Sequence, residues 1–258
     1  MGQSNTARPD PVEDLSQRLQ AAAANAYTVT IRGVEVPASI GNAYRAQAGL
    51  TAQFGRPIGW KVGRKSPDMT PSCAPLFESR TYAGGASVAT DTFRLWQMET
   101  EIAFRIASDL PARSEAYSRA ETMAAIGEML ACFEVIDSRF AEWPDVAPFL
   151  QLADLMSHGG MVLGEPVPFD PAFDFLGAKT SIRIGEDAAV AGAGNPAGDP
   201  IDLVAWLAAD RGLKAGDLVT TGSYTGMRVL PPGKTATGTV EGVGSVSVRR
   251  NGDASAAE

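Results

Sequence analysis

The order of strand-like and helix-like segments constrains the fold of this chain more than any other feature of its sequence. From about Leu76 onward, short stretches of alternating apolar and polar residues follow one another, separated by glycines and prolines. A doubly wound fold needs a helix after nearly every strand, and the segments do not alternate in that way. The sequence therefore predicts an α+β fold, with a small N-terminal α/β unit over residues 1–75 and a larger domain over residues 76–258.

Three segments carry helix signals in both their pattern and their ends. Residues 11–26 are alanine-rich and begin with a proline, and residues 39–54 begin at Ser39, a residue type that caps helices. Residues 200–217 form an apolar stripe and contain Gly212, which suits a helix C-terminus. Weaker patterns predict a hairpin over 28–37, an amphipathic helix over 118–133, a strand-like run over 133–140, a short helix over 148–156 and a closing hairpin over 240–248.

Composition excludes several classes of partner. The net charge of -8 argues against nucleic acid, because phosphate binding needs a basic surface. Two cysteines, Cys73 and Cys132, provide neither a disulfide framework nor a zinc cluster, so we expect a reducing, cytoplasmic environment. No apolar run approaches the roughly 18 residues of a membrane span, and we expect no membrane partner.

Two glutamates stand two residues apart in "RLWQMETEIAFRI", a stretch that reads as a strand. Because successive side chains of a strand point to opposite faces, Glu99 and Glu101 lie on one face. The pattern is typical of a solvated sheet face, and it also fits half of a metal site.

Glu134 is a third unusual carboxylate, because it stands in the apolar run "MLACFEVID". Burial of a carboxylate is costly unless it is paired, hydrogen-bonded or bound to a metal. Two interpretations stay open: a buried ion pair with Arg139 or Arg94, or a metal ligand that joins Glu99 and Glu101. Three converging carboxylates would repel one another by roughly 4 kcal/mol per pair at 4 Å, so they would need a cation. Oxygen ligands of this kind suit Mg²⁺ or Mn²⁺ rather than zinc.

Lys61 and His158 are the remaining chemically active candidates. Lys61 stands between apolar residues and glycines in "PIGWKVG", where burial would lower its pKa toward the range used in acid–base catalysis. A lysine that extends its ammonium to solvent at a strand end is the alternative. His158 is the only histidine, and we expect it to be a loop residue without a catalytic role.

Six blocks of the sequence together resemble the 2-keto-4-pentenoate hydratase/4-oxalocrotonate decarboxylase family of the fumarylacetoacetate hydrolase superfamily. They occur in the order found in that family and extend from about Ala38 to Arg249. The blocks are "GWKVG", "METEIAF", "FEVIDSR", "LADLMSHGGMVLG", "GDPIDLVAWLAADRGLKAGDLVTTGSYTG" and "VEGVGSVSV".

The resemblance implies a role for each candidate residue. Glu99, Glu101 and Glu134 correspond to the family's three ligands of a divalent metal, and Lys61 corresponds to its active-site lysine, which transfers a proton or holds the substrate carboxylate. The "TGSYT" segment, with Ser223 and Thr225, corresponds to a loop that lines the substrate pocket.

The resemblance also implies a fold and an activity. The fold would be a small N-terminal part on a mixed β-roll domain. The activity would be metal-dependent hydration of a small 2-hydroxydienoate or 2-oxo-alkenoate in aromatic catabolism, giving a 4-hydroxy-2-oxo acid. The alternatives are decarboxylation of a 2-oxo-alkenedioate and a non-catalytic subunit that binds a 2-oxo acid. A homo-oligomer is expected, or a subunit that associates with a hydratase or decarboxylase partner.

Three departures from the family pattern bear on the reaction. Ser79 of "LFESR" occupies a position where family hydratases generally have an acid, with Glu78 before it. The segment "ADLMSHGG" lacks the asparagine usual after its "AD". His158 does not match the His–Glu pair of the hydrolase branch, which argues against C–C bond hydrolysis.

Overall fold

The computed structural model describes residues 10–192 and 194–252, and these form two compact units. One unit comprises residues 10–55 with Ser138–Ser157, and the other comprises Arg56–Asp137 with residues 158–252. This division differs from the expected boundary near residue 75. The reason is that β1 (Pro57–Gly63) and β2 (Ser72–Phe77) pair within the large sheet of the second unit, through contacts that are remote in sequence.

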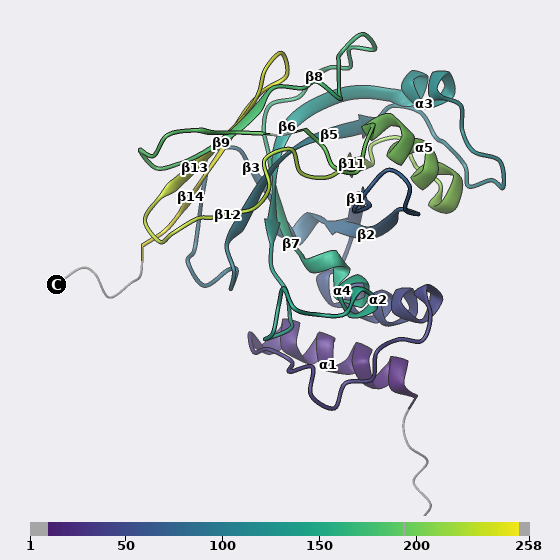
Figure 1. The fold of residues 1–258 in the computed structure, drawn as a ribbon, viewed down its shortest axis with the longest axis vertical. Coiled ribbons are helices and arrows are strands. Elements are labelled where there is room, and N and C mark those ends of the chain that lie inside the picture. Colours follow the sequence, from purple (N-terminus) through teal and green to yellow (C-terminus); the bar gives the residue numbers. More distant parts are fainter. Residues whose placement is uncertain (1–9, 193, 253–258) are drawn as a thin grey trace, which may run out of the picture. The chain divides into compact units, whose positions relative to one another are not determined.

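The smaller unit is helical (Figure 1). Its helices are α1 (Pro11–Asn25), α2 (Ile40–Phe54) and α4 (Pro148–Ala153), followed by the 3₁₀ turn η2 (Leu155–Ser157). The Asp10 side chain caps α1, and Ser39 caps α2 by accepting a hydrogen bond from the Asn42 N–H at 3.2 Å. Leu15, Leu19 and Leu50 are fully buried and supply the apolar packing.

A buried ion pair also stabilises this unit. Arg139 donates from Nε to the Asp154 carboxylate, which also accepts hydrogen bonds from the Ser138 hydroxyl and the Arg139 N–H. The expected hairpin over residues 28–37 is wrong, because only Val29 makes a bridge there, and its partner is Phe140. A two-stranded hairpin of this length gains too little from its own pairing to form without further support.

The larger unit contains two sheets (Figure 1). The first has the order β2–β1–β11–β5–β6–β7–β3, and two short strands, β12 and β8, pair with β5 and β6. The second has the order β10–β9–β13–β14–β4. The remaining strands of the first sheet are β3 (Thr81–Ala83), β5 (Gln97–Ile106), β6 (Ile126–Ile136), β7 (His158–Leu163), β8 (Val167–Pro168), β11 (Leu218–Thr220) and β12 (Arg228–Val229). Those of the second are β4 (Ala86–Val88), β9 (Thr180–Ile184), β10 (Val190–Ala191), β13 (Thr235–Val240) and β14 (Gly244–Arg250).

One face of the β5–β6 pair is covered by the second sheet. Met98 of β5 and Phe133 and Val135 of β6 pack in one cluster with Ile182 of β9 and Val246 of β14. Because side chains alternate along a strand, the opposite face of β5 and β6 carries the residues between them. Residues 99, 101 and 134 are on that opposite face.

The remaining helices of this unit are α3 (Arg119–Ala125), α5 (Pro200–Arg211) and the 3₁₀ turn η1 (Glu78–Arg80). The helix predicted over residues 200–217 is confirmed up to Gly212, which follows α5 with a φ of 73°. The helix predicted over 118–133 is wrong beyond Ala125, because β6 begins at once and pairs with both β5 and β7. Within residues 10–192 and 194–252, no helix combines the length and the apolar character that crossing a bilayer requires.

Candidate metal centre

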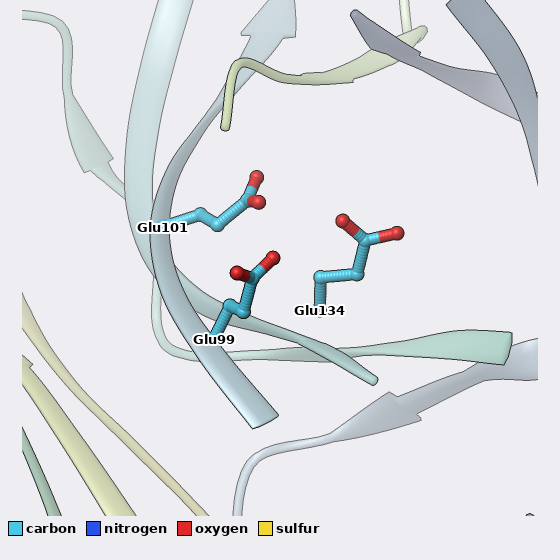
Figure 2. Close-up of side chains that lie close together, drawn as sticks. All are labelled: Glu99, Glu101 and Glu134. Carbon is cyan, nitrogen blue, oxygen red and sulfur yellow. The ribbon is translucent and has the colours of Figure 1, made fainter. Parts of the chain in front are cut away.

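The register of β5 and β6 brings three carboxylates together. Glu99 is directly opposite Glu134, and Glu101 is opposite Cys132, two residues away from Glu134 on the same face. Figure 2 shows the three carboxyl groups directed into one common space. One oxygen from each lies within 4.8 Å of the others, a grouping that can hold a metal ion. We call Glu99, Glu101 and Glu134 the carboxylate trio.

Two members of the trio are buried and Glu99 is half-buried, which excludes the solvated sheet face. Glu101 and Glu134 are each 1% exposed. Burial, together with the negative charge of Glu134, raises the pKa of Glu99 to about 7. Burial, then the charges of Glu134 and Glu99, raises the pKa of Glu101 well above its usual range. At 4.8 Å, two carboxylates repel by roughly 3 kcal/mol at an effective dielectric of about 20, so the trio favours any cation that can enter.

Glu134 is held by two side chains on a single oxygen. Its Oε1 lies 2.5 Å from Lys61 Nζ and 2.9 Å from His158 Nδ1. Burial opposes ionisation of Glu134, but Lys61 and His158 outweigh it, and its pKa is lowered. Glu134 therefore forms a buried ion pair, but its cation is Lys61, which was not among the partners considered from the sequence. Arg139 pairs instead with Asp154.

Lys61 reaches the trio from β1 and is 8% exposed. The alternative that this lysine extends its ammonium to solvent is therefore wrong. Its strand approaches β11 very closely at Gly59. A Cβ at that position would lie 1.8 Å from the Leu218 carbonyl oxygen, so only glycine fits. Gly59 lies two residues before Lys61 and allows β1 to lie close to β11, which positions the lysine.

The loop after β11 contacts the trio at two points. The Gly222 N–H donates to Oε2 of Glu101 at 3.1 Å, and Ser223 forms a hydrogen bond with Glu99 that favours its ionised form. Thr225 is used differently, because its hydroxyl accepts from the Thr100 N–H at 3.0 Å and donates to the Gly226 carbonyl. Ser223 of the expected pocket loop therefore contacts the trio through its side chain, whereas the hydroxyl of Thr225 bonds to backbone groups.

His158 is the residue that sequence reasoning missed. It was expected in a loop, and it opens β7 with 2% of its surface exposed, in contact with Glu134. A local pattern could not show this, because "SHGG" is also typical of a turn. Glu78, by contrast, is exposed and forms an ion pair with Arg56, and Ser79 beside it is also exposed.

Comparison with known proteins identifies the family. The family model described as fumarylacetoacetate (FAA) hydrolase C-terminal matches residues 38–249. The chain belongs to the fumarylacetoacetate hydrolase family. The resemblance inferred from the six sequence blocks is thereby confirmed.

Curated members of the family resemble the chain over about three quarters of its length. It is 31% identical to a 2-keto-4-pentenoate hydratase of Burkholderia vietnamiensis, over 74% of this chain and 77% of the relative. It is 30% identical to a 2-hydroxyhexa-2,4-dienoate hydratase of Comamonas testosteroni, over 75% of this chain and 78% of the relative.

A solved structure confirms the fold. The structure of 4-oxalocrotonate decarboxylase from Pseudomonas putida G7, complexed with magnesium and adipate, matches with a TM-score of 0.82 and 23% identity. The match covers 95% of this chain and 99% of the decarboxylase. The mixed α+β architecture expected for this family is confirmed.

Proposed function

We propose that this chain is a divalent-metal-dependent hydratase that adds water to a small 2-hydroxydienoate or 2-oxo-alkenoate, giving a 4-hydroxy-2-oxo acid. The observation that carries the proposal is the largely buried carboxylate trio with Lys61 in contact with Glu134, in a family member whose curated relatives are named as hydratases.

The trio fits Mg²⁺ or Mn²⁺ by its donor chemistry. All three ligands are carboxylate oxygens, the set that these hard cations prefer. The raised pKa values of Glu99 and Glu101 show that negative charge is unfavourable there without a cation. When bound, the ion would supply Lewis-acid stabilisation of negative charge on the substrate oxygens.

The side chains around the trio would perform the remaining steps. Lys61 holds a proton at Nζ, deep in the site, and can donate it to the substrate or pair with the substrate carboxylate. The Ser223 hydroxyl would help to orient the oxo acid beside Glu99. Burial of Glu101 and Glu134 would limit the water that reaches the substrate oxygens beside them.

Dienol absorbance provides a direct test. The protein is incubated with Mg²⁺ and 2-hydroxypenta-2,4-dienoate, and the loss of absorbance is followed together with formation of the 4-hydroxy-2-oxo acid. Lys61→Met should lose at least about 100-fold in rate, since a positioned general acid or base contributes that much. Lys179→Met is the control, because Lys179 is 79% exposed. Unchanged absorbance with a panel of dienoates of different tail lengths would exclude the hydratase.

A decarboxylase is the second candidate, and the structural match supports it. The 4-oxalocrotonate decarboxylase of Pseudomonas putida G7 shares the fold over 95% of this chain. Release of CO₂ from a 2-oxo-alkenedioate, without hydration of a dienoate, would favour this activity. Tight binding of Mg²⁺ and oxalate without turnover of either substrate would instead indicate a non-catalytic subunit. Light scattering on the same preparation measures the expected homo-oligomer.

A further inference from the structure

His158 reaches the trio because β7 contains an irregularity. In the regular part of the β6–β7 pairing, Glu134 is opposite Met161 and Val135 is opposite Gly160. Regular pairing would next place Gly159 opposite Ile136, but the register shifts there and His158 is opposite Ile136 instead. One extra residue in β7 therefore moves His158 to the face of the sheet that carries Glu134.

The backbone around His158 is adapted to this arrangement. A Cβ at Gly159 would lie 2.6 Å from the Asp137 Cβ and 2.9 Å from the Val135 carbonyl oxygen, so the bulge needs glycine. The three residues before His158 (Leu155, Met156 and Ser157) have φ values of 54°, 54° and 60°. Left-handed backbone is strained in residues other than glycine, and strain of this kind is concentrated at functional sites.

The contact between His158 and Glu134 gives the two carboxylate oxygens of Glu134 different partners. An ionised carboxylate can only accept, so the Nδ1 of His158 carries the hydrogen of their 2.9 Å hydrogen bond. Lys61 donates to the same oxygen, Oε1. Because both donors engage Oε1, we assign Oε2 to a cation shared with Glu99 and Glu101.

We propose that His158 is a positioning residue of the metal centre, whose Nδ1–H holds Oε1 of Glu134 so that Oε2 faces the other two carboxylates. The inference rests on the metal site of the proposed function and adds a residue to it. Outer partners of this kind fix the orientation of a metal ligand, and their loss typically weakens metal affinity 10- to 100-fold.

Three substitutions at position 158 separate positioning from simple packing. Asparagine places an amide N–H near the location of Nδ1, glutamine places one near the location of Nε2, and leucine has no donor. Mn²⁺ affinity is measured from the electron paramagnetic resonance signal of free Mn²⁺, and near-ultraviolet circular dichroism reports the tertiary fold. His158→Asn should bind Mn²⁺ within about 3-fold of the parent. His158→Gln and His158→Leu should bind 10- to 100-fold more weakly and change the spectrum of the bound ion.

The possible outcomes distinguish this inference from the proposed function. If all folded variants bind Mn²⁺ as tightly as the parent, His158 does not position Glu134, and the metal site stands. If His158→Asn and His158→Gln lose Mn²⁺ affinity equally, the donor position at Nδ1 does not matter, and the inference is overturned. Failure of the parent itself to bind Mn²⁺ would overturn the metal site and the role of His158 together.

Discussion

Replacement of Glu99 by glutamine should stabilise the metal-free protein. The pKa of Glu99 is raised to about 7, chiefly by burial and then by Glu134, from an ordinary value of 4.5. Each unit of this difference corresponds to about 1.4 kcal/mol, so ionised Glu99 costs the folded state about 3 kcal/mol above pH 7. A neutral amide avoids that cost but needs its own hydrogen bonds. We therefore expect Glu99→Gln to gain about 1–3 kcal/mol in the free energy of unfolding.

The gain should depend on pH with a defined sign. Below about pH 4.5, Glu99 is protonated in the folded and unfolded states, and parent and variant should be equally stable. Between pH 4.5 and 7, the folded parent retains a proton that the unfolded chain has released, so the stability of the parent falls as pH rises. The difference between the two proteins should thus open across this interval and reach its full value above pH 7.

Thermal unfolding in EDTA at pH 4.5 and pH 8 measures the effect. For a chain of this size, 1 kcal/mol shifts Tm by about 2–4 °C, so a gain of about 1–3 kcal/mol should raise the Tm of the variant roughly 2–12 °C above that of the parent at pH 8. Added Mg²⁺ should raise the Tm of the parent and leave that of the variant nearly unchanged. Glu128→Gln is the control, since Glu128 is on β6 with a side chain 43% exposed. A variant less stable than the parent at pH 8 without metal would refute the electrostatic reasoning.

Three further outcomes are expected. Gly59→Ala should destabilise the protein by at least about 3 kcal/mol in urea unfolding and displace Lys61, because the added Cβ meets the backbone of β11. Asp154→Asn should cost about 3–5 kcal/mol, because it leaves the buried Arg139 guanidinium without its countercharge. Asp14→Asn is the matched control and should cost about 0.5 kcal/mol or less, because Asp14 is the half-exposed i,i+4 partner of Arg18. Mg²⁺ binding near pH 7 should release protons, seen as a buffer-dependent heat in calorimetry, because two carboxylates of the trio have raised pKa values; equal heats in all buffers would contradict this.

Local patterns predicted those parts of the fold that depend on local interactions. The start of α1 at Pro11, the start of α2 after its cap Ser39 and the end of α5 near Gly212 are confirmed, since each depends on residues within one turn. The helix over residues 118–133 failed because β6 gains hydrogen bonds from both neighbouring strands, which outweigh helix propensity from Ile126 onward.

The candidate site shows the same division. Alternation along one strand predicted that Glu99 and Glu101 share a face, and the geometry agrees. Their approach to Glu134 depends on register between strands, which the sequence of either strand alone does not specify. The position of His158 depends on a bulge in β7, and one residue more or less there turns its side chain to the other face of the sheet. The alternation of residues in β7 alone, without its pairing to β6, therefore could not predict which face His158 occupies.

The balance of charge in the site argues for a cation of charge two. The trio contributes three negative charges when ionised, and Lys61 offsets one through its contact with Glu134, which leaves two. A monovalent ion would leave one buried negative charge uncompensated, at a cost that proteins usually avoid by protonation. A divalent ion neutralises the site and removes the reason for Glu99 and Glu101 to retain protons. Loss of the Lys61 ammonium would therefore do more than remove a proton donor, since it would return one unit of negative charge to a site that a divalent ion can then no longer neutralise.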